Sequence, residues 1–194
     1  GKAPYKDISG FTFVSQFSAY VYPLLVRADA PWKTWEELIA WARKNPGGLK
    51  IGTTAARSLD SKGYAMWHVE KRENVKFTYV PFKGSSDVLA ALLGGHIHLF
   101  LSTLDASTTS YIKDGKLRNL LYIGSNKIPG FENIATMKDL YGYEHPSFMV
   151  VFGPKGLPTQ VVKTLESAFA KGTKSPEYLK ILDRMHTPAV YNDC

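Results

Sequence analysis

The sequence predicts an α/β fold built on a parallel β-sheet. Short apolar segments rich in β-branched and aromatic residues are each followed by a polar loop and a helix-forming segment, and this order occurs three times. The strands are expected at 49–52, 75–82 and 96–101, the loops at 53–60, 83–86 and 102–105, and the helices at about 61–74, up to Leu93, and at about 106–113. Right-handed crossovers between such strands make the sheet parallel and gather the loops at the strands' carboxyl ends.

A helix over about residues 34–45 precedes the first of these strands. Thr34 and Glu37 fit a capping box, in which the threonine hydroxyl accepts from a first-turn amide and the glutamate reaches back to the cap. The run Asn45-Pro46-Gly47-Gly48 ends this helix, because proline cannot continue it and glycine tolerates positive φ.

The later helices have start and stop signals of the same kind. Ser85 or Ser86 is expected to cap the helix that ends at Leu93, where Gly94-Gly95 closes it. Asp114-Gly115 ends the helix that begins near Ala106.

The two ends of the chain do not follow this rhythm. Residues 11–26, which Pro23 interrupts, and residues 147–152 are prone to form strands that could cross between two lobes. Two helices are expected at about 159–172 and 176–185, each with a one-sided apolar stripe. The stripes contain Val161, Val162, Leu165 and Phe169 in the first helix and Leu179, Ile181 and Leu182 in the second. Too little strand remains to cover them, so one lobe is expected to be incomplete.

Composition limits the classes of function. The chain has 194 residues, of which 44% are hydrophobic, and no apolar run is long enough to span a membrane. The single cysteine, Cys194, excludes an internal disulfide framework and a cysteine-based metal cluster. The net charge of +7 is spread without a basic run, which argues against nucleic acid as a partner and mildly favours anionic ligands.

Three hydroxyl-rich loops are the candidate anion sites. They are Gly52-Thr53-Thr54 to Ser58, Lys83-Gly84-Ser85-Ser86 and Ser102-Thr103-Leu104-Asp105. Each stands between a strand and a helix start, where free amides, hydroxyls and the helix dipole favour a carboxylate. The alternative is an ordinary serine or threonine cap facing solvent.

Two other kinds of site are alternatives to an anion site. Ser58, Asp60 and His68 supply the residue types of a hydrolase triad, but they lie in one local stretch without a G-x-S-x-G elbow. His96 and His98 could share one side of a strand as a metal pair, but no cysteine or carboxylate stands at ligand spacing.

Several motifs, in order, resemble those of the solute-receptor proteins of tripartite tricarboxylate transporters. The most specific run is Val80-Pro81-Phe82-Lys83-Gly84, which is followed by further matching segments. These are Leu92-Leu93-Gly94-Gly95, Phe100 with Ser102, and Ile112-Lys113-Asp114-Gly115-Lys116-Leu117-Arg118. Similar runs also occur at Trp35-Glu36-Glu37-Leu38-Ile39, Asn45-Pro46-Gly47, Ile51-Gly52-Thr53-Thr54 and Phe152-Gly153-Pro154-Lys155-Gly156-Leu157-Pro158. The resemblance covers nearly the whole chain.

The resemblance implies a type II periplasmic-binding-protein fold. Two parallel-sheet lobes would be joined by two crossing strands, with residues 28–146 forming lobe II. Residues 1–27 and 147–194 would form the crossing strands and the remainder of lobe I, whose N-terminal part is expected to be absent. The sequence begins at Gly1 without an apolar signal segment, so a targeting sequence is expected to have been removed or to lie outside it.

The resemblance also implies a periplasmic receptor and not an enzyme. It would capture a dicarboxylate, tricarboxylate or aromatic acid in an interlobe cleft and deliver it to the integral-membrane subunits of a transporter. No cofactor or metal is expected. The effector domain of a regulator, which shares this fold, is the alternative, and a hydrolase is a weaker one.

Two departures from the family pattern bear on the ligand. Arg57 stands beside Ser58 where a glycine is usual, Ser61 replaces a histidine, and residues 97–101 lack the usual pair of acids. Without those acids the site loses acceptors for an ammonium group, which disfavours an amino-acid ligand, whereas Arg57 would add a bidentate donor for a carboxylate. The predicted ligand-binding residues are Gly52, Thr53, Thr54, Arg57, Ser58, Lys83, Gly84, Ser85, Ser102, Thr103 and Asp105.

Overall fold

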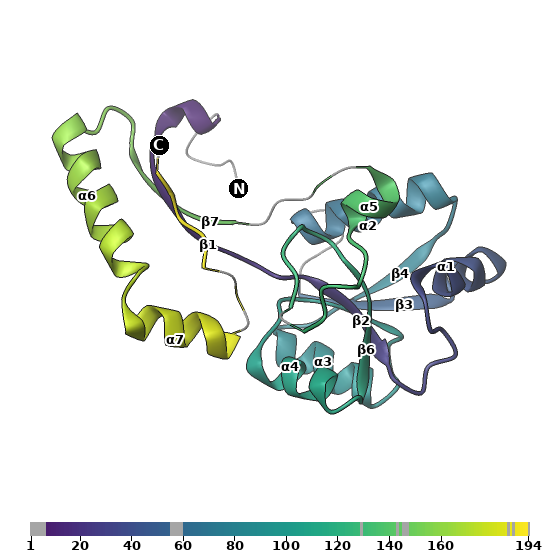
Figure 1. Cartoon of the computed structure of the whole chain (residues 1–194). Helices are drawn as coiled ribbons and strands as arrows, with labels where there is room; N and C mark the ends of the chain where they lie inside the picture. The colour runs from purple at the N-terminus through teal and green to yellow at the C-terminus, as the bar shows by residue number, and fades with distance from the viewer. Residues whose placement is uncertain are drawn as a thin grey trace. The chain divides into compact units, whose positions relative to one another are not determined.

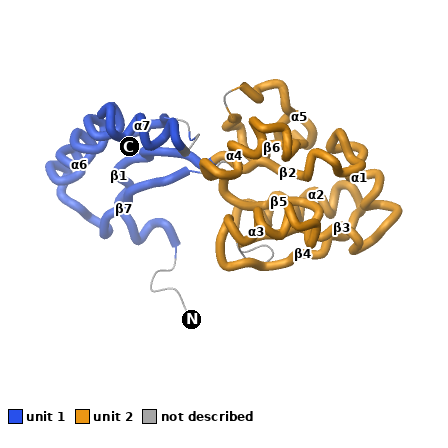
Figure 2. Tube along the Cα trace, turned by 90° about the horizontal axis from the view of Figure 1, so that it is seen from below, with its two compact units in different colours: residues 1–20, 148–194 blue, residues 21–147 orange. Residues whose placement is uncertain are grey.

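The chain passes between two structural units at two points, after Tyr20 and after Ser147. The computed structural model describes residues 7–54, 60–128, 130–142, 144, 148–185, 187 and 189–193. Unit 1 comprises Gly1–Tyr20 and Phe148–Cys194, and unit 2 comprises Val21–Ser147 (Figure 2). Unit 2 thus begins at Val21, whereas the sequence placed the start of that lobe at Ala28.

Unit 2 is built on a five-stranded sheet (Figure 1). Its strand order is β4 (Phe77–Pro81), β3 (Leu49–Thr53), β5 (Leu99–Leu101), β2 (Pro23–Arg27) and β6 (Leu117–Tyr122). The strand β3 runs parallel to both β4 and β5, as expected from the repeated strand-loop-helix order.

One strand departs from the expected all-parallel order of this sheet. The strand β2 lies between β5 and β6 and runs antiparallel to both, so the sheet is mixed. The strand-forming stretch 11–26 is interrupted, as expected, after Ala19, and Pro23 is the first residue of β2. A proline fits this position because the first residue of a strand need not donate to the ladder.

Five helices accompany the sheet in the described part of unit 2. They are α1 (Trp35–Lys44), α2 (Ser61–Glu73), α3 (Ser85–Leu93), α4 (Ala106–Lys113) and α5 (Met137–Tyr141). Figure 1 shows α3 and α4 on one side of the sheet and α2 and α5 on the other. Side chains such as Leu25, Phe100 and Leu92 are fully buried between these layers, so unit 2 has its own apolar core.

Two of the predicted caps differ in detail. The Thr34 hydroxyl accepts from the Glu37 amide, as expected, but the Glu37 carboxylate accepts from the Lys33 amide at 2.6 Å instead of from the cap residue. Neither Ser85 nor Ser86 caps α3, because its N-cap is Gly84, which makes no side-chain hydrogen bond.

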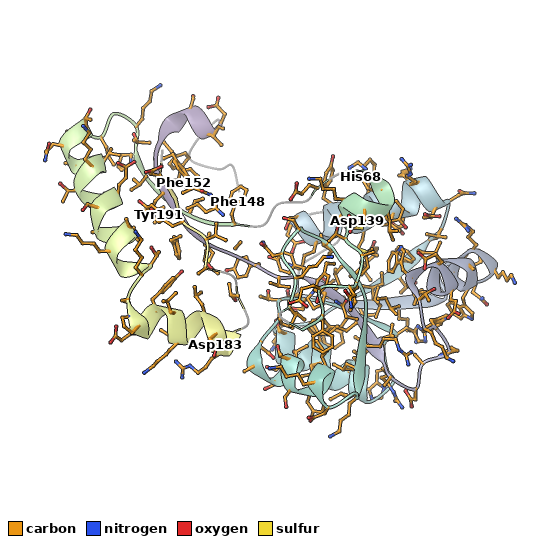
Figure 3. The ribbon with its side chains drawn as sticks, viewed as in Figure 1. His68, Asp139, Phe148, Phe152, Asp183 and Tyr191 are labelled. Carbon is orange, nitrogen blue, oxygen red and sulfur yellow. The ribbon has the colours of Figure 1, made fainter. Side chains whose placement is uncertain are left out.

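Unit 1 contains a small antiparallel sheet and two helices. The strand β1 (Phe11–Ala19) pairs with β7 (Phe148–Pro154) on one side and β8 (Asn192–Asp193) on the other, after a short 3-10 turn, η1 (Ile8–Gly10). Figure 3 labels Phe148 and Phe152 on β7, and the Phe152 ring packs against Phe11 and Phe13. The helices α6 (Thr159–Gly172) and α7 (Pro176–Met185) coincide with the predicted ranges.

The apolar stripes of α6 and α7 remain partly uncovered. Val161 is 41% exposed and Leu179 is 43% exposed, while Leu165 and Phe169 are half-buried. Leu182 is 5% exposed, so the expectation of exposure was wrong for this residue. No helix in the described ranges is long and apolar enough to cross a membrane.

Candidate ligand-binding site

The three candidate loops leave the sheet of unit 2 at the same edge. Thr53, the last residue of β3, lies opposite Pro81 at the end of β4 and Leu101 at the end of β5. The Phe82 amide donates to the Thr53 carbonyl at 2.8 Å, which holds the first two loops together where they begin. The predicted adjacency of the loops is therefore confirmed for their described residues.

A pair of serine hydroxyls joins the second loop to the third. Ser85 Oγ and Ser102 Oγ lie 2.7 Å apart, one at the start of α3 and the other directly after β5. Ser102 is fully buried and Ser85 is half-buried. Each hydroxyl can donate one proton and accept others, so the pair can turn a donor toward an acceptor group of a ligand.

The start of α3 has the features of an anion site. Its N-cap, Gly84, offers no side-chain acceptor to the first-turn amides. The φ of Gly84 is −153°, which any residue can adopt, and a side chain there would meet nothing within 4 Å. Neither backbone conformation nor packing therefore requires this glycine. The open space leaves the amides of a helix N-terminus accessible to a carboxylate.

The remaining predicted residues have diverse surroundings. Thr53 is buried, Thr54 and Thr103 are half-buried, and Lys83 is exposed. Gly52 lies inside β3 under α3, where an added Cβ would stand 2.3 Å from Ile97 Cδ1, so packing explains this glycine. Arg57 and Ser58 fall outside the described residues.

Asp105 is committed to its own helix. Its Oδ1 accepts from the Thr108 amide at 2.7 Å and from the Thr108 hydroxyl at 2.8 Å, so it is the N-cap of α4. The negative charge of this carboxylate is thereby directed at the helix start, where the dipole stabilises it.

Sequence analysis missed one charged residue at this edge of the sheet. The Lys62 side chain, on the first turn of α2, is only 7% exposed, and its Nζ lies 2.5 Å from Asp60 Oδ2. The same ammonium lies 4.8 Å from the centroid of the Tyr22 ring. The sequence feature that could have identified Lys62 is its position in a first helical turn, where acidic residues are favoured.

A hydrolase triad does not form from the described residues. Asp60 caps α2 by accepting from the Gly63 amide at 2.8 Å, and residue 68 stands about 12 Å further along the helix at about 1.5 Å per residue. The ring of His68, which Figure 3 labels, lies against Tyr64 at 4.6 Å between centroids.

The two histidines of the alternative metal pair have different surroundings. His98 Nδ1 accepts from the Lys50 amide at 3.0 Å, and its ring packs against Trp32 and Trp41. Burial, helped by the charge of Lys50, lowers the pKa of His98. His96 is exposed, and no metal-binding cluster of three side chains occurs among the described residues.

The sheet, its loops and the two units define the class of the protein, a periplasmic-binding-protein fold. The model of the family "Tripartite tricarboxylate transporter family receptor" matches residues 1–194. The chain therefore belongs to this receptor family.

Related proteins agree with this assignment and are longer than the chain. A Cupriavidus necator protein, "UPF0065 protein in gbd 5'region", is 32% identical over 190 residues, which are 97% of this chain and 56% of that protein. A TctC solute-binding protein from Polaromonas, solved without ligand, superposes with a TM-score of 0.80 at 28% identity, covering 97% of this chain and 64% of the other. The R. palustris protein Rpa4515, solved with adipate, gives 0.75 at 26% identity and coverages of 97% and 62%.

Proposed function

We propose that this protein is a receptor for a small organic carboxylate and that it passes this solute to a membrane transporter. The observation that carries the proposal is the convergence of three loops at one sheet edge, with the Ser85–Ser102 hydroxyl pair beside the start of α3. Loops at the carboxyl ends of parallel strands are where open α/β sheets bind ligands.

The chemistry of this edge suits a carboxylate. The first-turn amides of α3 have no side-chain acceptor at the cap. The carboxylate of Asp105 caps α4, and that of Asp60 caps α2 and pairs with Lys62. Donors thus remain available while the charges of these two carboxylates are directed elsewhere. A third carboxylate, that of Asp87 in the first turn of α3, is exposed. A bound carboxylate would accept from the α3 amides and the serine hydroxyls and would gain from the helix dipole.

The class of ligand follows from the same residues and from a relative. Loops that offer amides and hydroxyls recognise an acid without selecting an ammonium group. The relative solved with adipate is 26% identical to this chain, which makes a dicarboxylate the first ligand to test. Tricarboxylates and aromatic acids belong to the same proposed range.

We further propose that the receptor works in the periplasm, without turning over its ligand. Its partners would be the integral-membrane subunits of a tripartite tricarboxylate transporter, as the family description indicates. Arg57 and Ser58, which precede α2 in the sequence, are proposed as additional contacts to the ligand carboxylate.

The test is a comparison of a free acid with its uncharged ester. Titration calorimetry on the whole gene product should detect binding of adipate and no binding of dimethyl adipate at the same concentration. Binding of the acid should leave it chemically unchanged. Equal binding of the ester, or conversion of either compound, would contradict the proposal.

A further inference from the structure

Lys62 occupies a place in the structure that its chemistry disfavours. The side chain is 7% exposed, although burial removes much of the hydration that stabilises an ammonium. It also stands in the first turn of α2, where the helix dipole repels a positive charge. Asp60 offsets part of this cost through an ion pair of 2.5 Å.

The ion pair does not by itself explain the lysine. Asp60 caps α2 through the Gly63 amide, and this cap needs no cation. A buried pair can often be replaced by apolar residues of similar size with no loss of stability. Residues that conflict with local stability are typical of functional sites.

Lys62 lies at the same edge of the sheet as the serine pair. Tyr22, whose ring faces the ammonium at 4.8 Å, directly precedes Pro23, the first residue of β2. The register aligns Leu24 with Leu101, the last residue of β5, so Tyr22 lies beyond the end of β5. Ser102 follows β5 at that end, on the strand next to β2.

The ammonium can make more contacts than those described. It carries three N–H donors, and one of them donates to Asp60. The face of the Tyr22 ring attracts the positive charge but is not a conventional hydrogen-bond acceptor. Because β5 and β2 are adjacent in the sheet, Ser102 and Tyr22, whose ring lies beside the ammonium, stand at neighbouring strand ends.

We propose that Lys62 is a specificity-determining residue of the receptor site, where its buried ammonium binds a second ionised group of the ligand. This inference rests on the proposed function. The serine pair and the start of α3 would bind one carboxylate, and Lys62 would make the site prefer a ligand with another.

The test compares adipate with monomethyl adipate on the whole gene product. The wild-type protein should bind the diacid more tightly than the monoester by about tenfold or more, the worth of a hydrogen bond between charged groups. Lys62→Met, which keeps the length of the side chain without its charge, should remove this preference. Lys71→Met, at an exposed lysine of the same helix, should leave the preference intact.

A second variant separates ligand recognition from a structural role. Asp60→Asn retains an oxygen that can cap α2 but removes the charge that competes for the ammonium. It should preserve or increase the preference for the diacid.

If Lys62 only stabilises the fold, both variants will lower the melting temperature and neither will change the preference. If the wild-type protein binds no organic acid, the proposed function fails, whereas binding with an unchanged preference in Lys62→Met overturns the Lys62 inference alone.

Discussion

Gly84 and Gly52 lie at the same end of the sheet, but different constraints act on the two positions. An added Cβ at Gly52 would collide with Ile97 and Val88, whereas Gly84 has open space and an extended backbone. Both were predicted as ligand contacts because they follow or end a strand. Only the surroundings of each Cα, which depend on the packing of α3, distinguish a packing glycine from one that leaves room for a ligand.

Replacing Gly84 with serine should change stability and affinity in opposite directions. Serine is a slightly better N-cap than glycine, so Gly84→Ser should raise the free energy of unfolding by a few tenths of a kcal/mol. The new side chain would occupy the open space and engage the α3 amides, so the affinity for adipate should fall about tenfold or more. Urea unfolding and calorimetry measure the two effects.

Gly52→Ala is the contrasting variant. Its Cβ overlaps the Ile97 side chain, and overpacking of this kind costs about 1–3 kcal/mol of stability.

A Gly84→Ser protein that binds adipate as tightly as the wild type would show that the carboxylate does not lie at the start of α3.

At the level of elements, the sequence was most informative where a pattern is local. The helices α4, α6 and α7 begin and end where their caps, apolar stripes and glycines indicated. The antiparallel insertion of β2 was not predictable in the same way, because a strand's neighbours depend on contacts distant in sequence. The same holds for Lys62, since helix patterns assign a lysine to solvent, whereas its burial and its contact with Tyr22 depend on a segment distant in sequence.

The cap of α4 gives a prediction at this scale. Asp105→Ala should lower the free energy of unfolding by about 1 kcal/mol, because it removes the acceptor of the Thr108 amide. Asp105→Asn should change it by only a few tenths of a kcal/mol, since the amide oxygen can cap the helix as well. Chemical denaturation of the two variants provides the comparison.

The binding of adipate tests whether Asp105 has a second role. Its carboxylate is directed at α4, so Asp105→Asn should bind adipate with nearly wild-type affinity. A large change in affinity without a change in stability would instead make Asp105 a ligand contact, as the loop position suggested.

Across the whole molecule, apolar burial is distributed unevenly between the two units. In the described part of unit 1, the buried apolar side chains are Val14, Ala19, Val162 and Leu182, whereas unit 2 has a continuous core on its sheet. The chain spans 56% of its Cupriavidus necator relative and 64% of the Polaromonas structure. The exposed faces of α6 and α7 accord with the sequence-based expectation that these helices need a further surface to cover.

Hydrogen exchange on the 194-residue chain should show this imbalance. Local opening is easiest where few apolar contacts are lost, so amides of β1, β7 and α6 should exchange faster than those of β3 and β5. The comparison is sharpest at Ser15 and Gln16, which pair with both β7 and β8, because an edge position does not account for a difference there. Mass spectrometry of peptides from each strand measures the rates. Equal protection of β1 and β3 would show that the apolar groups left exposed on α6 and α7 do not limit the stability of unit 1.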